Sequence, residues 1–156
     1  MWHADPEILR WTGVEPGQSE ERTLEWIRFA SDAAARGIAW HFVIEVDGSV
    51  AGSCDVRLPD RSDPRIGEIG YLVAAPFRRC GVGFVALSLL IDWSFGEPLR
   101  LERVQALVHP DNAASLALVA RLGFTREGLL RAFRAEPGGR EDREMWSVLA
   151  IDWRAS

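Results

Sequence analysis

A glycine-rich turn, RRCGVG at residues 78–83, separates two apolar stretches of the chain. Residues 69–73 before it have the composition of a strand, and residues 84–91 after it have that of a buried helix. Backbone N–H groups at the start of a helix have no partner within that helix, so they can hold an anion such as a phosphate. Two adjacent arginines add positive charge where that anion would lie. This unit predicts an α/β fold with a candidate phosphate site between a strand and a helix.

The rest of the chain predicts one mixed α/β domain over residues 1–156, because it contains no repeat, low-complexity segment or linker. Asp5 and Ser19 are typical helix N-caps, and Asp47-Gly48 is typical of a two-residue hairpin turn. We expect helices over residues 5–12, 19–36, 82–95 and 111–123, and strands over residues 40–46, 50–58, 66–73, 103–108, 124–134 and 143–153.

Composition argues against several classes of function. A net charge of −5 does not suit general nucleic-acid binding, and the apolar runs are shorter than the roughly 18 residues of a membrane span. The N-terminus lacks the basic and apolar segments of a signal peptide. Cys54 and Cys80 have neither metal-ligand spacing nor the number that a disulfide framework needs. We therefore expect a cytoplasmic protein without a metal.

Three motifs in matching order carry a family resemblance. Arg78, Gly81 and Gly83 satisfy the pattern Arg/Gln-x-x-Gly-x-Gly/Ala, and residues 68–73 (EIGYLV) precede it as a strand. Downstream, residues 109–128 contain HPDNAAS, then RLGF and EG. Through these motifs the chain resembles the GNAT superfamily of acyl-CoA-dependent N-acyltransferases, in the branch of the ribosomal-protein N-terminal acetyltransferases. The resemblance covers roughly residues 5 to 153.

The resemblance implies the GNAT fold, an α/β (α+β) architecture. Its central sheet is mixed and mostly antiparallel, splayed at a bulge in the family's fourth strand, here residues 66–73, and flanked by helices. Met1 falls almost directly on Asp5-Pro6, so we expect the family's first strand and part of its first helix to be absent from this sequence, either because the start is misassigned or truncated or because the sheet is one strand short. A sheet without that strand exposes a new edge, which favours pairing with another chain. We expect a monomer or a homodimer.

The resemblance also implies acetyl-CoA as co-substrate, with its pyrophosphate on the backbone amides of residues 79–84. Gly81 and Gly83 would let the backbone approach the ligand closely. The alternative for this segment is a plain strand-to-helix turn with solvated arginines, and Cys80 fills space rather than acting as a nucleophile. The residues expected to contact CoA are Leu72, Val73, Arg78, Arg79, Cys80, Gly81, Val82, Gly83, Phe84, Asn112 and Ser115.

Catalytic roles follow from the resemblance as well. The backbone N–H of Tyr71 would face the thioester oxygen and polarise it, and Val73 would pair with the pantetheine arm; the alternative is an ordinary paired strand. The Tyr71 side chain is free to point to either face. Ser115 matches the serine proposed to protonate the departing thiolate, or else only decorates the first turn of its helix. Asn112 would hydrogen-bond the pantetheine arm and cap that helix, two roles that can coexist.

The general base is open among several residues. Glu68 is the first candidate, because it lies on an otherwise apolar strand where partial burial would raise its pKa; the alternative is a structural acid paired with an arginine. His109 is the second candidate, since its neutral-range pKa suits the task. Glu141 and Asp142 come third, and Glu136 also stays open.

Two further expectations concern the helix over residues 19–36 and the tryptophans. Trp2, Trp11 and Trp40 lie in segments that line the acceptor groove in this superfamily, where they would form an aromatic wall, or else they only pack. Trp26 is expected in the core with the helical stripe formed by Leu24, Ile27, Ala30 and Ala34.

The resemblance therefore implies transfer of an acetyl group from acetyl-CoA to a primary amine by direct attack in a ternary complex. The acceptor would be a peptide N-terminus or a small-molecule amine. One alternative is a GNAT-fold enzyme that uses another acyl-CoA or a carrier-bound acyl donor. A second is a catalytically silent CoA-binding regulatory module.

Overall fold

The computed structural model describes residues 4–136 and 138–153. Every predicted helix and strand is present, within a few residues at each end. In chain order the elements are α1 (Pro6–Trp11), α2 (Glu20–Ala35), β1 (Ala39–Val46), β2 (Ser49–Arg57), β3 (Ile66–Val73), the 3₁₀ turn η2 (Ala75–Phe77), α3 (Val82–Phe95), β4 (Arg103–Val108), α4 (Ala113–Arg121), β5 (Thr125–Glu136), β6 (Gly139–Leu149) and α5 (Ala150–Trp153).

Local chemistry explains where several elements begin. The Asp5 carboxylate accepts hydrogen bonds from the N–H groups of Glu7 and Ile8, and the Ser19 hydroxyl accepts one from Arg22, so both predicted N-caps are confirmed. Asp47 and Gly48 both have positive φ, as a type I′ hairpin turn between β1 and β2 requires.

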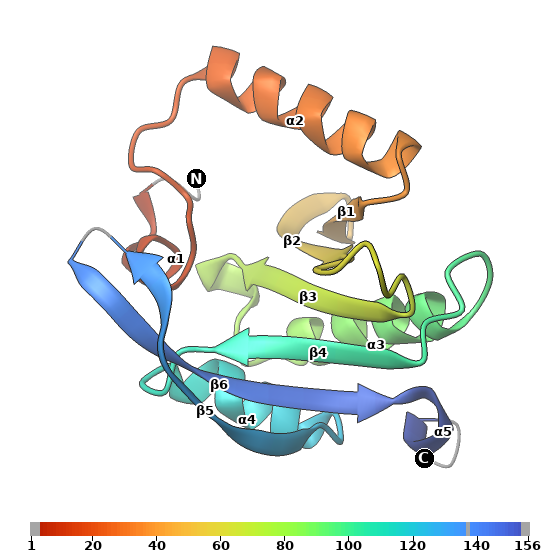
Figure 1. Cartoon of the computed structure of the whole chain (residues 1–156). Coiled ribbons are helices and arrows are strands. Elements are labelled where there is room, and N and C mark those ends of the chain that lie inside the picture. Colours follow the sequence, from red (N-terminus) through yellow and green to blue (C-terminus); the bar gives the residue numbers. More distant parts are fainter. Residues whose placement is uncertain (1–3, 137, 154–156) are drawn as a thin grey trace.

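Within the described residues the sheet has six strands in the order β1-β2-β3-β4-β6-β5, and only β3 and β4 are parallel (Figure 1). This is the mixed, mostly antiparallel sheet that the resemblance implies. Helices α3 and α4 cover one face, where the buried core lies. Helices α1 and α2 contact the other face, since Trp11 packs on His109 after β4 and Trp26 packs on His41 of β1.

The sheet opens between its two parallel strands. β3 pairs with β4 at only three positions, from Ile66 opposite Arg103 to Glu68 opposite Gln105. Beyond Glu68 the strands diverge, while β3 stays paired with β2 as far as Val73. The expected splay is present. The expected bulge is not, because the β2–β3 register is continuous over residues 68–73; the splay comes from divergence of β3 and β4 alone.

Within the described residues the first strand is β1, and it forms one edge of the sheet. Helix α2 lies over that edge, where only β1 is beneath it. The predicted core stripe is wrong for this reason: Ala33 is the buried residue of α2, whereas Leu24, Trp26 and Ile27 are about half exposed, at 47 to 48%.

The last predicted strand is too long at its C-terminal end. Leu149 of β6 pairs with Arg103, the first residue of β4, so no partner remains for the residues that follow. The backbone N–H of Ala150 donates instead to the Glu102 carbonyl, and residues 150–153 form α5. No helix in the described part of the chain is long and apolar enough to cross a membrane.

Candidate functional site

The divergence of β3 and β4 leaves backbone groups open at the end of β3. Ala74 donates to the Ala51 carbonyl, so alternate residues of β3 direct their N–H and C=O groups toward β2. Tyr71 and Val73 have the opposite phase and direct theirs toward β4, which no longer pairs there. Leu72 has its backbone on β2, so of the three predicted contacts on β3 it is the one with no open backbone group.

The turn after β3 presents a second set of open groups. Arg79 and Gly81 both have positive φ, of 60° and 88°, and Gly81 is the N-cap of α3 without a side-chain cap. The first helical bond runs from Val85 to the Gly81 carbonyl. Within the described chain, the N–H groups of residues 79–84 therefore have no hydrogen-bond acceptor. Such a run at a helix N-terminus is an anion-binding site.

Arg78 takes a role that the sequence motif does not reveal. Its Nε donates to the Val73 carbonyl at 2.9 Å, and its guanidinium lies 2.6 Å from the Asp5 carboxylate. Burial raises the pKa of Asp5, but the hydrogen bonds from Arg78 and from the helix N–H groups outweigh it and lower that pKa. Arg78 thus links the end of β3 to the start of α1.

Arg79 and Cys80 are exposed, unlike Arg78. The Arg79 guanidinium makes no hydrogen bond or ion pair within the described residues, so its charge is available to a ligand. The Cys80 thiol donates to the Phe77 carbonyl at 2.9 Å, which fits a structural filler of the turn. Gly83 lies where α3, α4 and β3 converge: a Cβ there would lie 3.3 Å from Leu118 and 3.6 Å from Val73.

Three predicted residues meet across the opening. Asn112 caps α4, because its Oδ1 accepts from the Ser115 N–H at 3.1 Å. This confirms the capping role. The Tyr71 side chain lies on the α4 side of the sheet, where burial raises the pKa of its phenol and the Ser115 hydroxyl lowers it in part. The phenol oxygen is buried and has no hydrogen-bond partner in the described structure.

Glu68 lies on the opposite face of β3 and is buried, at 8% exposure. Arg57 donates to one carboxylate oxygen at 2.7 Å and Gln105 donates to the other at 3.3 Å. These contacts belong to a polar row that crosses five strands and that sequence reasoning missed; its members are Asp55, Arg57, Glu68, Gln105, Arg103, Ser147 and Glu127.

The other candidate bases differ in what they contact. His109 accepts the Asp111 N–H on Nδ1 at 3.0 Å, so its proton is on Nε2, 3.5 Å from Glu141. In this geometry the Nδ1 lone pair of His109 is engaged by a backbone N–H. Asp142 accepts the Ala132 N–H, at a positive-φ irregularity of β5. Glu141 and Glu136 both bind the same buried guanidinium, that of Arg143.

The tryptophans divide between the two faces. Trp11 stacks on His109 with ring centroids 5.1 Å apart and lies near the opening, as an acceptor wall requires. Trp40 packs on Trp93 of α3 instead, which places it in the core layer. Trp2 lies outside the described residues.

Sequence reasoning also missed a contact at the start of α3: the Arg121 guanidinium, at the end of α4, covers the ring of Phe84, 4.4 Å from its centroid. Residues 37 positions apart in sequence give no local signal of such a pair. It holds the end of α4 against the first turn of α3, beside the open amides.

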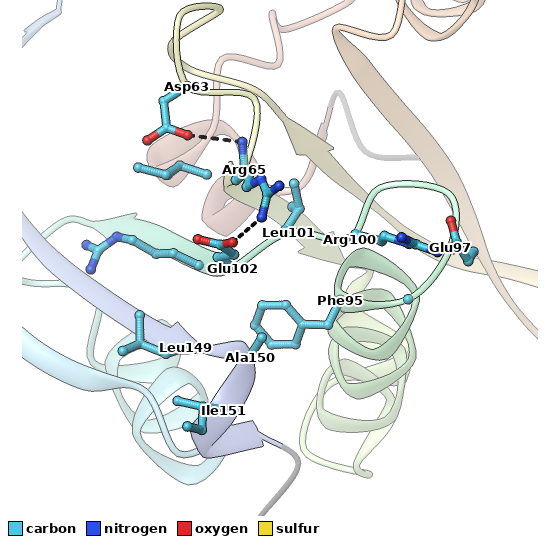
Figure 2. Close-up of a pocket in the computed structure, with 13 residues that line it drawn as sticks. Asp63, Arg65, Phe95, Glu97, Arg100, Leu101, Glu102, Leu149, Ala150 and Ile151 are labelled. Atoms are coloured by element: carbon cyan, nitrogen blue, oxygen red, sulfur yellow. Dashed lines mark hydrogen bonds and ion pairs between the residues drawn. The ribbon is translucent and has the colours of Figure 1, made fainter.

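A hollow lies at the other end of the sheet (Figure 2). Its volume is about 1040 Å³, and it is lined by the starts of β3 and β4 and the end of α3. Four of its charged side chains form ion pairs with each other, Arg65 with Glu102 and Arg100 with Glu97. A second cavity of about 660 Å³ runs from β1 along α3 to Cys80 and is mostly apolar.

The residues at the opening fit acetyl-CoA. The open amides suit its pyrophosphate, and the unpaired β3 backbone suits its pantetheine amides. No cluster of His, Cys, Asp and Glu in the described residues is arranged to hold a metal ion.

Comparison with known proteins agrees with this geometry. Residues 1–125 match the Acetyltransferase (GNAT) domain family. The uncharacterised N-acetyltransferase p20 of Bacillus licheniformis is 30% identical over 155 residues, covering 98% of this chain and 86% of that protein. Mycobacterium smegmatis RimJ in complex with CoA-disulfide superimposes with a TM-score of 0.78 at 28% identity, covering 91% of this chain and 70% of that chain.

The ribosomal-protein-S5-alanine acetyltransferase of Vibrio fischeri gives a TM-score of 0.79 at 25% identity, covering 95% and 82% of the two chains. The motifs, the open sheet and these likenesses agree. The chain belongs to the GNAT family of N-acetyltransferases, which transfer an acetyl group from acetyl-CoA to an amine.

Proposed function

We propose that this protein acetylates the N-terminal amine of a protein or peptide, by direct attack on acetyl-CoA within a ternary complex. The observation that carries the proposal is the divergence of β3 and β4 after Glu68, directly beside the open amides of residues 79–84. A donor with a pyrophosphate and an extended amide-containing arm matches both features. The V. fischeri relative is named as acting on an alanine of a ribosomal protein, which favours a peptide acceptor over a small amine.

The donor would be held and polarised mainly by backbone. Its pyrophosphate would lie on the amides at the start of α3, with Arg79 as the nearby cation. Val73 would bond the pantetheine arm through its N–H, since Arg78 already occupies one lone pair of its carbonyl. The Tyr71 N–H would donate to the thioester oxygen, and such a bond strengthens as negative charge develops in the transition state.

The acceptor would approach across the face that carries the polar row, between α1 and the opening. Trp11 and His109 would line its path. We propose Glu68 as the base that takes the ammonium proton, through a water, because its two observed contacts leave carboxylate lone pairs free. Its pairing with Arg57 also supports the alternative, in which Glu68 is a structural acid, and mutation distinguishes the two.

The test is turnover on matched peptides. Acetyl-CoA is mixed with a peptide that has a free N-terminal alanine, and released thiol and peptide mass are followed. The control peptide is N-terminally blocked and carries one lysine. Because this chain has no lysine of its own, self-modification of side chains does not add to the signal. Acetylation of the free N-terminus alone supports the proposal, whereas lysine acetylation in the blocked peptide would contradict the acceptor assignment.

The same assay addresses the alternatives. Faster turnover with a longer acyl-CoA, or with an acyl group on phosphopantetheine, would indicate that this compound and not acetyl-CoA is the donor. Tight CoA binding with no turnover on any amine would indicate a silent binding module.

The two cysteines, buried Cys54 and exposed Cys80, are both free, which suits a cytoplasmic setting.

A further inference from the structure

The Tyr71 hydroxyl is the one buried side-chain N or O atom without a hydrogen-bond partner among the described residues. Folded proteins rarely leave such a group unpaired, because it loses its hydrogen bonds to water and gains none in return. The rest of the side chain is packed against the core, as a phenylalanine would be. Packing therefore explains the aromatic ring but not the hydroxyl, and the hydroxyl calls for another role.

A second hydroxyl, that of Ser115, lies near it on α4. Ser115 is in the first turn of α4, and its N–H is held by Asn112, which fixes the start of the helix. The Ser115 hydroxyl lies near the Tyr71 phenol and opposes the effect of burial on the phenol pKa, although the two do not meet hydrogen-bond geometry in the described structure. Two hydroxyls, one from β3 and one from α4, thus face each other with spare hydrogen-bonding capacity.

We propose that Tyr71 is a positioning residue: its hydroxyl donates to the Ser115 oxygen when CoA binds, so that the single Ser115 proton points at the CoA sulfur. A serine hydroxyl has one proton and two acceptor sites. When the Tyr71 hydroxyl donates to one acceptor site of the Ser115 oxygen, the Ser115 proton is directed to the CoA sulfur. This deepens the proposed function and rests on it. Burial disfavours the phenolate, so Tyr71 acts as a fixed donor and keeps its own proton.

The inference is tested on ligand binding, which needs no acceptor. Wild type, Tyr71→Phe, Ser115→Ala and the double variant are titrated calorimetrically with CoA and with desulfo-CoA, which lacks the sulfur. Ser31→Ala, an exposed serine of α2, is the control for a hydroxyl lost elsewhere. The titrations are run at pH 7 and at about pH 9.5, because a larger fraction of a thiol is ionised at the higher pH.

We expect wild type to prefer CoA over desulfo-CoA, more strongly at the higher pH, because a thiolate is the better acceptor. Tyr71→Phe should reduce this preference by about 3- to 10-fold, the worth of one hydrogen bond, and should leave desulfo-CoA affinity unchanged. Ser115→Ala should cause the same loss, and the double variant no more than either single change, because the two hydroxyls act as one unit.

Two results would overturn the inference. An unchanged preference in Tyr71→Phe would show that the hydroxyl does not act on the sulfur, and additive losses in the double variant would show that the hydroxyls act separately. Failure of wild type to bind CoA at all would instead refute the proposed function, and with it this inference.

Discussion

Arg78 and Arg79 are neighbours in the same sequence motif, but we expect alanine at Arg78 to reduce stability and alanine at Arg79 to weaken CoA binding. Arg78 bonds Val73 and Asp5 in a half-buried setting, with side chains 30% and 12% exposed in the ion pair. A hydrogen bond to a charged group contributes roughly 1.5 to 3 kcal/mol. Solvent partly screens the bond between Arg78 and Asp5, so we expect Arg78→Ala to lower the free energy of unfolding by about 1.5 kcal/mol.

Arg79 is exposed and has no partner in the described structure, so Arg79→Ala should change the free energy of unfolding by less than about 0.5 kcal/mol. It should weaken CoA binding by about tenfold, as loss of one charge-assisted bond to phosphate would. That effect should shrink at high salt. Arg78→Ala should keep most CoA affinity once the protein is folded.

The assays are urea unfolding and CoA titration at low and high salt. Asp5→Asn supplies a check on the ion pair, because asparagine keeps the N-cap of α1 but removes the charge. The double variant of Arg78→Ala and Asp5→Asn should show a coupling of about 1 kcal/mol. The reasoning is refuted if Arg78→Ala is as stable as wild type but loses CoA binding, or if Arg79→Ala binds CoA normally.

Three further changes test other parts of the site. Glu68→Gln should lower kcat by about 100-fold or more with CoA affinity unchanged if Glu68 is the base; a loss confined to stability would make it structural. Iodoacetamide should modify exposed Cys80 and spare Cys54, whose pKa burial raises to about 11, and CoA should protect Cys80; equal modification with and without CoA would place the ligand elsewhere. Hydrogen bonds from Arg103 and Ser147 hold the pKa of Glu127 at about 2, so its contribution to stability is present above about pH 4.5 and is lost as pH falls toward 2. Glu127 is partly exposed, so Glu127→Gln should remove only about 1 kcal/mol of this acid dependence; an unchanged slope of stability against pH would show that the pair is not formed in solution.

The order of helices and strands could be predicted from sequence because local signals mark it. Asp5, Ser19 and Asn112 cap helices through their own side chains, and Asp47-Gly48 fits one turn type. The extent of β6 could not be predicted, because it depends on where its partner β4 begins, 46 residues earlier, at Arg103. The stripe on α2 failed for a similar reason: its period indicates a helix, but only the sheet decides which side is covered.

The part of the site that is formed by backbone groups could be predicted from the sequence. The open N–H groups of residues 79–84 follow from a glycine turn that starts a helix, whatever the side chains do. Side-chain roles were harder, because they depend on partners distant in sequence. Asp5 contacts Arg78 from 73 positions away, Arg57 contacts Glu68 from a neighbouring strand, and Ser115 lies near Tyr71 although it belongs to a helix and Tyr71 to a strand.

Amide hydrogen exchange tests the central claim most directly, because it reports on the backbone groups that are said to hold the donor. Exchange is followed by NMR with and without acetyl-CoA. We predict slower exchange at Tyr71, at Val73 and at residues 79–84, and none of this protection around the hollow near Arg65 at the other end of the sheet. Protection near Arg65 instead, or none at residues 79–84 with acetyl-CoA bound, would contradict the account.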